Sequence, residues 1–294
     1  MLLIILQAIY PAYLTVKSKA MKKILLAFDG SHFSEGTLAF ARSLNEKNPI
    51  LLTAAFLPQV DFANLWSFTG VGPGGTSIPI VQTKDAPEIK ENTRRFELYC
   101  QKNLIEYRIH KTFFDFALPE LKKETRFADL LVISSETFYE QAGTDTPNGY
   151  LQEVLHDAEC PVIVVPEKFE FPKSNILTYD GSETSVYAIK QFAYVMNELT
   201  GNETMLVYAK DNAEELLPEQ ANIEELASRH FPDLSLLRLE ANPKKYFSTW
   251  LDEKDGAIVV SGAFGRSSIS RSFRRSFVTD IISEHRLPLF IAHR

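Results

Sequence analysis

The chain has 294 residues, of which 45% are hydrophobic and 23% charged, a composition that excludes an intrinsically disordered protein. Its net charge of −7 argues against general nucleic-acid binding, because a phosphate backbone requires a positive protein face. Cys100 and Cys160 lack paired spacing, so neither a disulfide framework nor a zinc site is indicated, and a cytoplasmic location is expected.

Residues 1–20 form an apolar opening segment that Pro11 interrupts and that is too short to span a membrane. Met21 is followed at once by KKILLAFDG, which is typical of a natural protein start. We therefore expect residues 1–20 to be a non-native or disordered extension, with a signal peptide as the alternative. We expect no membrane partner.

The remaining chain shows one pattern twice. The runs 22–29 and 175–180 are apolar and both lead into Asp-Gly-Ser, with Asp29 and Asp180 lying 151 positions apart. Apolar residues at helical spacing follow each run. These residues are Leu38, Ala41 and Leu44 in the first copy, and Val186, Ile189, Ala193, Val195, Met196 and Leu199 in the second.

The two copies also end alike, because CPVIVV at 160–165 matches LPLFIA at 287–292, 127 positions later. The two spacings differ by 24 residues, which predicts an insertion in the first copy, the Gly- and Pro-rich loop 58–87. The pattern predicts a first domain at 21–167 and a second domain at 174–294, joined by a linker near 166–173.

Within each copy, short apolar runs alternate with helical stretches, which predicts an α/β fold with parallel strands and right-handed crossovers. Runs such as DLLVIS and GAIVVS are nearly continuous, so both faces of the sheet should be covered by helices. The expected strands lie at 23–29, 50–57, 105–111, 129–135 and 161–166, and at 174–180, 203–209, 234–240, 256–262 and 287–292.

The stretch 258–276, IVVSGAFGRSSISRSFRRS, has the order of a phosphate-binding turn. A strand leads into Gly262 and Gly265, and the four arginines that follow have no carboxylate among them. Glycine allows the backbone to turn tightly and approach a ligand, and N–H groups at a helix start face an anion. A strand-to-helix turn without any ligand is the alternative interpretation.

The Asp-Gly-Ser opening, the five-strand alternation, the turn after the fourth strand and the closing Pro-apolar strand occur in this order twice. In this combination the chain from Met21 onward resembles the universal stress proteins in their tandem two-domain form. The resemblance implies two tandem Rossmann-like domains, each a mostly parallel five-stranded sheet flanked by helices. It also implies ATP or a related adenine nucleotide as ligand, accompanied by Mg²⁺.

The family motif Gly-x2-Gly-x9-Gly-Ser/Thr matches Gly262, Gly265 and Ser276 of the second domain, with Arg275 in place of the third glycine. An arginine at this position either blocks a phosphate or pairs with it bidentately. The resemblance therefore implies that the nucleotide contacts Asp180, Gly181, Gly262, Gly265, Arg266, Arg271, Arg275 and Ser276.

In the first domain the same motif positions are occupied by Ser135, Phe138, Asn148 and Gly149. The intervening loop carries Glu136, Glu140 and Asp145, whose negative charges repel phosphate. We therefore expect the first domain to have lost nucleotide binding. For Asp29 and Asp180, the alternative to ligand contact is a turn residue that stabilises free N–H groups at a helix start.

Catalysis has no support in the sequence, because no nucleophile–base–acid constellation and no Walker motif occurs. The expected function is a non-enzymatic regulatory module in the stress response. A nucleotide-independent dimerisation or interaction scaffold and a weak ATPase are the alternatives. Because the strands 161–166 and 287–292 are natural sheet edges, we expect pairing between the two domains or between chains.

Overall fold

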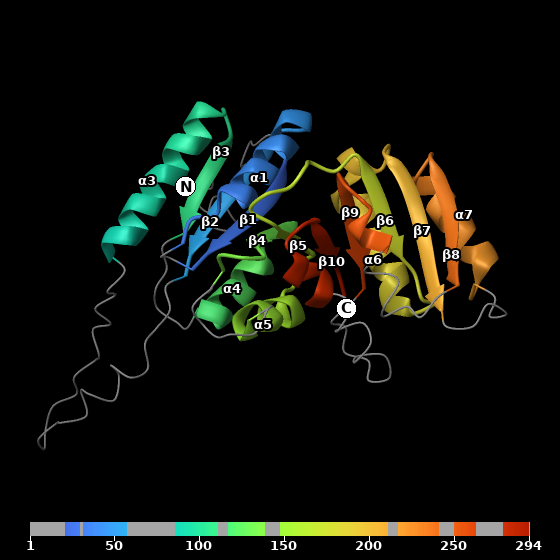
Figure 1. The fold of residues 1–294 in the computed structure, drawn as a ribbon. Helices are drawn as coiled ribbons and strands as arrows, with labels where there is room; N and C mark the ends of the chain where they lie inside the picture. Colours follow the sequence, from blue (N-terminus) through green and yellow to red (C-terminus); the bar gives the residue numbers. More distant parts are fainter. Residues whose placement is uncertain are drawn as a thin grey trace, which may run out of the picture.

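The computed structural model describes residues 21–29, 32–57, 86–110, 117–138, 148–210, 217–240, 250–262 and 279–293. They form one ten-stranded sheet with helices on both faces (Figure 1). The strands of the N-terminal half (residues 21–165) are β1 (Lys22–Phe28), β2 (Ile50–Phe56), β3 (Glu106–His110), β4 (Leu130–Ser134) and β5 (Val162–Val165). Those of the C-terminal half (residues 174–293) are β6 (Ser174–Thr178), β7 (Glu203–Lys210), β8 (Leu234–Glu240), β9 (Ala257–Ser261) and β10 (Leu289–Ile291). Every strand expected from the sequence is confirmed to within two residues at each end.

The helices are α1 (Glu35–Lys47), α3 (Ala86–Lys102), α4 (Ala117–Thr125), α5 (Gly149–Asp157), α6 (Glu183–Val195) and α7 (Gln220–His230), with the 3-10 turn η3 (Asn197–Leu199) and a further helix described over 279–284. Serines begin the two helices that follow the Asp-Gly-Ser runs. The Ser34 side chain accepts from the N–H of Thr37 at 3.1 Å, and Ser182 accepts from Ser185 at 3.2 Å. These side chains satisfy N–H groups that a helix start leaves free.

The strand order is β3-β2-β1-β4-β5-β10-β9-β6-β7-β8. Each half has the same internal order, and all neighbouring strands within a half are parallel. The halves meet where β5 and β10 pair antiparallel, with Leu289 opposite Val164 and Ile291 opposite Val162. The expected pairing of the terminal strands therefore occurs within the chain, and β5 and β10 each have a neighbour on both sides.

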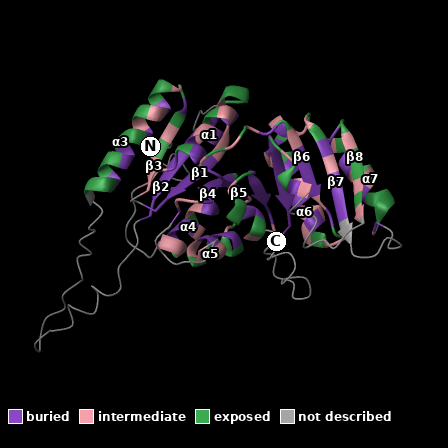
Figure 2. Ribbon diagram, viewed as in Figure 1, coloured by how far each residue is buried: buried purple, intermediate pink, exposed green. Residues whose placement is uncertain are grey.

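Strand β1 shows why continuous apolar runs indicate two covered faces. Ile24, Leu26 and Phe28 face the core beneath α1, α3, α6 and α7, while Leu25 and Ala27 face the core beneath α4, α5 and the 279–284 helix. Both cores contain residues of both halves, so burial is continuous along the sheet (Figure 2). The fold therefore has one sheet with two extended cores.

Side-chain contacts lie on both sides of the join between the halves and across it. Within the C-terminal half, Phe290 of β10 is fully buried and packs edge-on against Phe192 of α6, with ring centroids 5.2 Å apart. Lys22, at the start of β1, places Nζ 2.7 and 2.8 Å from the carboxylate oxygens of Glu198 in η3. The Glu198 side chain is only 3% exposed, so this ion pair is largely withdrawn from solvent.

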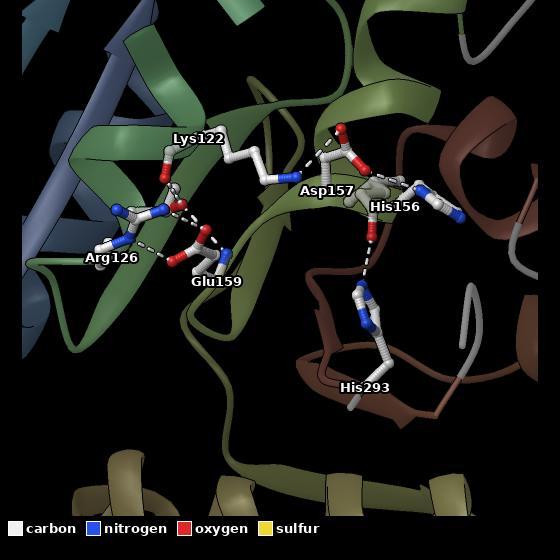
Figure 3. A network of polar contacts seen from close by, with 8 residues as sticks. Lys122, Arg126, His156, Asp157, Glu159 and His293 are labelled. Carbon is white, nitrogen blue, oxygen red and sulfur yellow. Dashed lines mark hydrogen bonds and ion pairs between the residues drawn. The ribbon is translucent and has the colours of Figure 1, made fainter. Parts of the chain in front are cut away.

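A polar cluster on α4 and α5 lies beside the junction (Figure 3). Asp157 is 2.9 Å from His156 Nδ1 and 3.6 Å from Lys122 Nζ. Arg126 binds both carboxylate oxygens of Glu159, at 2.7 and 2.8 Å. From the C-terminal half, His293 Nε2 lies 2.7 Å from the Leu155 carbonyl oxygen. The cluster ties the end of α5 both to α4 and to the chain following β10.

The expected insertion 58–87 lies outside the described residues except for its last two positions, and residues 1–20 lie outside them entirely. Among the helices that are described, none is long and apolar enough to cross a membrane. The first and second domain boundaries stay predictions.

Because the cores are shared, we expect Phe290→Ala to lower the free energy of unfolding by about 3–5 kcal/mol, the usual cost of truncating a buried phenylalanine. Urea unfolding followed by far-UV circular dichroism should keep a single transition. The control is Phe127→Ala, since Phe127 is 64% exposed and should change stability little. Two separate transitions, with only one shifted by the Phe290 change, would contradict the shared core.

A second expectation concerns pH. The hydrogen bond with His156, followed by the charge of Lys122, lowers the pKa of Asp157 below its ordinary value of 3.8. A lowered folded-state pKa gives stability that is present above the ordinary value and is lost as pH falls through the lowered value. The stability difference between wild type and Asp157→Asn, measured by urea unfolding, should therefore be larger near about pH 6 than near about pH 3. A difference that is constant over this range would contradict the assignment.

Candidate functional site

In an open parallel sheet, ligands bind at the carboxyl ends of the strands where the strand order reverses. In the N-terminal half this point lies between β1 and β4, and in the C-terminal half it lies between β6 and β9. Asp29 and Asp180 follow the first strand of each half, while Ser135 and Gly262 follow the fourth. These four residues therefore lie at the two switch points.

At the switch point of the C-terminal half, Asp180 is exposed and forms the turn before α6. Its Oδ1 accepts from the Ser182 N–H at 3.1 Å and from the Ser182 hydroxyl at 2.6 Å. The carboxylate thus orients the residue that caps α6, as the turn interpretation expects. Its exposure leaves it accessible to a ligand at the same edge.

The two glycines at this edge are required by packing within the chain. Gly181 has φ +80°, and a Cβ there would lie 2.7 Å from the Cβ of Pro218. A Cβ on Gly262 would lie 2.7 Å from the Ser185 nitrogen and would overlap the Thr184 carbonyl. The end of β9 therefore rests directly on the first turn of α6. A positive φ with a close Pro218 side chain accounts for glycine at 181, and close backbone packing accounts for glycine at 262.

The other residues expected at this site lie outside the described residues. They are Gly265, Arg266, Arg271, Arg275 and Ser276. The structure brings together Asp180, Gly181 and Gly262, and the phosphate-binding part of the site stays a prediction.

The corresponding edge of the N-terminal half is closed by its own linker. Glu167, two residues after β5, accepts from the Gly36 N–H in the first turn of α1 at 2.9 Å and from the Ser134 hydroxyl at 2.9 Å. A Cβ on Gly36 would lie 2.8 Å from the Glu167 Cα, so the linker presses against the helix start. A carboxylate of the chain itself occupies the position where a helix start attracts an anion.

Asp29 differs from Asp180 in its surroundings. It is 4% exposed, and its carboxylate lies 2.6 Å from His32 Nδ1 and accepts from the His32 N–H at 2.8 Å. Ser135, in the position that corresponds to Gly262, has its hydroxyl 2.9 Å from Nδ1 of His285. Since His285 belongs to the C-terminal half, this edge of the N-terminal half is completed across the junction.

The remaining motif positions of the N-terminal half have structural roles. Phe138 is 3% exposed and packs in the core beneath α4 and α5. Asn148 caps α5, because its Oδ1 accepts from the Leu151 N–H at 2.9 Å while its Nδ2 donates to the Phe138 carbonyl at 2.8 Å. Phe138 and Asn148 thus serve the core and the start of α5, and the loss of a nucleotide site in this half stays a prediction.

The cysteines lie away from both switch points. Burial raises the pKa of the Cys100 thiol and of the Cys160 thiol to about 12, so both are poor nucleophiles at neutral pH. In the part of the chain that the structure covers, no group of three or more His, Cys, Asp or Glu residues is placed to hold a metal ion.

Sequence reasoning missed Glu167 and His285. For Glu167 a signal existed, because it follows an expected strand at the edge where parallel strands present their ligand contacts. For His285 no such signal existed, since its contact with Ser135 depends on which edge of each half meets the other.

No protein-family model matches the sequence, and no curated protein matches it. Solved structures show instead that the chain has the fold of the universal stress proteins. It is similar to a universal stress protein from Archaeoglobus fulgidus DSM 4304, with a TM-score of 0.66 and 14% identity over 92% of this chain and 96% of that chain.

Two structures from Pseudomonas aeruginosa share this fold. A protein of strain UCBPP-PA14 assigned to the universal stress proteins has a TM-score of 0.51 and 10% identity, over 93% of this chain and 94% of that chain. A functionally unknown protein of strain PAO1 has a TM-score of 0.55 and 10% identity, over 93% of each chain. These similarities define the fold, and function is argued from the residues.

The packing of Gly262 gives a direct test. We expect Gly262→Ala to destabilise the ligand-free protein by about 1–3 kcal/mol, because a methyl group cannot fit against the α6 backbone without moving it. The control is Gly201→Ala, where a Cβ meets no atom within 4 Å. Thermal unfolding without added nucleotide measures both variants. Equal stability of the two would show that Gly262 is not a packing residue.

Proposed function

We propose that this chain is a regulatory, non-enzymatic module of the universal stress protein kind. In this proposal the C-terminal half binds one adenine nucleotide, such as ATP with Mg²⁺, and the N-terminal half binds none. The signal is a change in conformation or assembly that the nucleotide favours, without chemical conversion of the ligand.

The observation that carries the proposal is the position of Glu167. Its carboxylate accepts hydrogen bonds from the Gly36 N–H and the Ser134 hydroxyl. These are the donors that a phosphate would need at the start of α1. A phosphate entering this edge would have to displace a covalently tethered anion and would be repelled by it. Nucleotide binding is therefore assigned to the other half.

The sequences that follow Ser135 and Gly262 differ in charge, which supports the same assignment. The segment after Ser135 carries Glu136, Glu140 and Asp145, whereas the segment after Gly262 carries Arg266, Arg271 and two further arginines. Arginine is suited to phosphate because it offers several N–H donors in a planar fork. The C-terminal half thus combines positive charge with an exposed carboxylate, Asp180.

In the proposed complex, backbone N–H groups near Gly262 and Gly265 and the hydroxyl of Ser276 contact the phosphates. Arg266, Arg271 and Arg275 neutralise their charge, and Asp180 accepts from a hydroxyl or amino group of the nucleoside. Bound Mg²⁺ would offset phosphate charge.

The route from ligand to response runs through α6. Its first turn supports Gly262, and its buried residues Ile189 and Phe192 belong to the core that reaches the junction with the N-terminal half. A ligand that binds only the folded state stabilises it by about 2.7 kcal/mol at a concentration one hundred times its dissociation constant. Nucleotide binding would therefore stabilise the sheet that both halves share.

One observation favours a second candidate function, a nucleotide-independent interaction scaffold. Gly181 and Gly262 are both explained by contacts within the chain, to Pro218 and to the backbone of Thr184. Neither glycine therefore requires a ligand. The two candidates differ in whether the purified protein binds nucleotide at all.

Isothermal calorimetry with ATP and Mg²⁺ separates the candidates. We expect one site per chain in wild type and at least a tenfold loss of affinity in Gly265→Glu, because a carboxylate at the turn repels phosphate, a loss of about 1.4 kcal/mol. The matched control is Gly201→Glu, the same change at an exposed turn, which should bind as wild type does.

The absence of binding heat in wild type would support the scaffold instead. Phosphate release that exceeds a protein-free control in the same samples, and that Gly265→Glu abolishes, would contradict the non-enzymatic part of the proposal.

A further inference from the structure

The short turn η3 lengthens one connection of the C-terminal half relative to its counterpart in the N-terminal half. Between α1 and β2 the chain has only residues 48 and 49, whereas between α6 and β7 it has residues 196–202, which include η3. Two residues therefore suffice to join a helix and a strand of this kind. The extra residues of the C-terminal half are available for contacts that the turn itself does not need.

η3 uses this added length to hold the other half. Both carboxylate oxygens of Glu198 accept from Lys22 Nζ, at 2.7 and 2.8 Å, and Oε1 also accepts from Asn48 Nδ2 at 3.3 Å. The Glu198 and Lys22 side chains are 3% and 16% exposed, so each half contributes one charge to a pair that lies largely out of solvent. Removing one partner of such a pair is costly, because the other charge stays buried without a counterion. We call the Lys22–Glu198 pair the clasp.

The clasp and the candidate nucleotide site lie at opposite ends of α6. Met196 caps the C-terminal end of α6 and the N-terminal end of η3, so the two elements are continuous. Met196 and Leu199 are fully buried, and Asn175 Nδ2 donates to the Leu199 carbonyl at 2.8 Å, which ties η3 to β6. At its other end α6 supports Gly262, where an added Cβ would overlap the Thr184 carbonyl. The 13 residues of α6 span about 20 Å, so a rigid helix connects the two places.

We infer that the clasp is the contact through which a nucleotide bound to the C-terminal half tightens the pairing of the two halves, an inference that rests on the proposed function. A nucleotide seated against Asp180 and Gly262 requires the first turn of α6 in its place, because that turn supports both residues. The clasp requires the other end of α6 in its place, because η3 continues from it. Both contacts favour the same position of one helix, so each strengthens the other. Lys22 and Glu198 are thus positioning residues.

Isothermal calorimetry with ATP and Mg²⁺ on full-chain variants tests the coupling. The double variant Lys22→Met/Glu198→Gln removes the ion pair without leaving an unpaired buried charge, so it should fold. Coupling between two sites changes affinity about fivefold or more, and the double variant should bind ATP at least that much more weakly than wild type. Lys22→Arg keeps a cation that can bind the carboxylate and should retain wild-type affinity. The matched control is Glu124→Gln, which breaks an ion pair with His110 inside the N-terminal half and should bind ATP as wild type does.

The coupling should also appear in the reverse direction. Urea unfolding of wild type, Lys22→Met, Glu198→Gln and the double variant measures the interaction between the two residues. This interaction should be larger with saturating ATP and Mg²⁺ than without them, because linkage between two contacts is reciprocal. A clasp that served stability alone would give the same interaction under both conditions, and that result would contradict the inference.

The calorimetry separates this inference from the proposed function. ATP binding by wild type with unchanged affinity in the double variant would overturn the coupling and leave the nucleotide assignment standing. An equal loss of affinity in Glu124→Gln would also overturn the coupling, because the loss would then follow general stability. The absence of binding heat in wild type would overturn the proposed function and this inference with it.

Discussion

The rest of the structure depends on the antiparallel pairing of β5 with β10. It joins two five-stranded parallel sheets of identical strand order into one sheet and makes both cores continuous across the join. It brings His285 to Ser135 and His293 to the Leu155 carbonyl, contacts that neither half could form alone. It also removes from solvent the two strand edges that would otherwise be open to other chains.

Within this nearly symmetric frame the two switch points have different chemistry. The linker after β5 crosses the start of α1, where Glu167 satisfies the N–H and hydroxyl donors. It then packs Phe169 and Phe171 against Phe40, with centroids 5.7 and 5.4 Å apart. The same segment thus connects the halves and closes one ligand edge. Under the proposed function, the chain would keep its nucleotide site in the C-terminal half alone.

Much of the fold could be predicted from the sequence because it depends on local patterns. Runs such as DLLVIS are buried on both faces, so they reveal both the strand and its covering helices. The site was less accessible to such reasoning. From the motif, Gly262 is interpreted as a ligand contact. The structure shows that a larger residue at 262 would clash with the Thr184 backbone, which the sequence pattern does not reveal. The Ser135–His285 contact required knowing which strands meet at the junction, which no local pattern encodes.

The central claim is that the two halves have diverged, so that one chain holds one nucleotide. Native mass spectrometry of freshly purified protein tests it most directly, because it counts bound small molecules per chain and identifies them by mass. The account predicts a single adenine nucleotide per chain after incubation with ATP and Mg²⁺. Two nucleotides per chain would contradict the closure of the N-terminal half by Glu167, and none would contradict the assignment of a site to the C-terminal half.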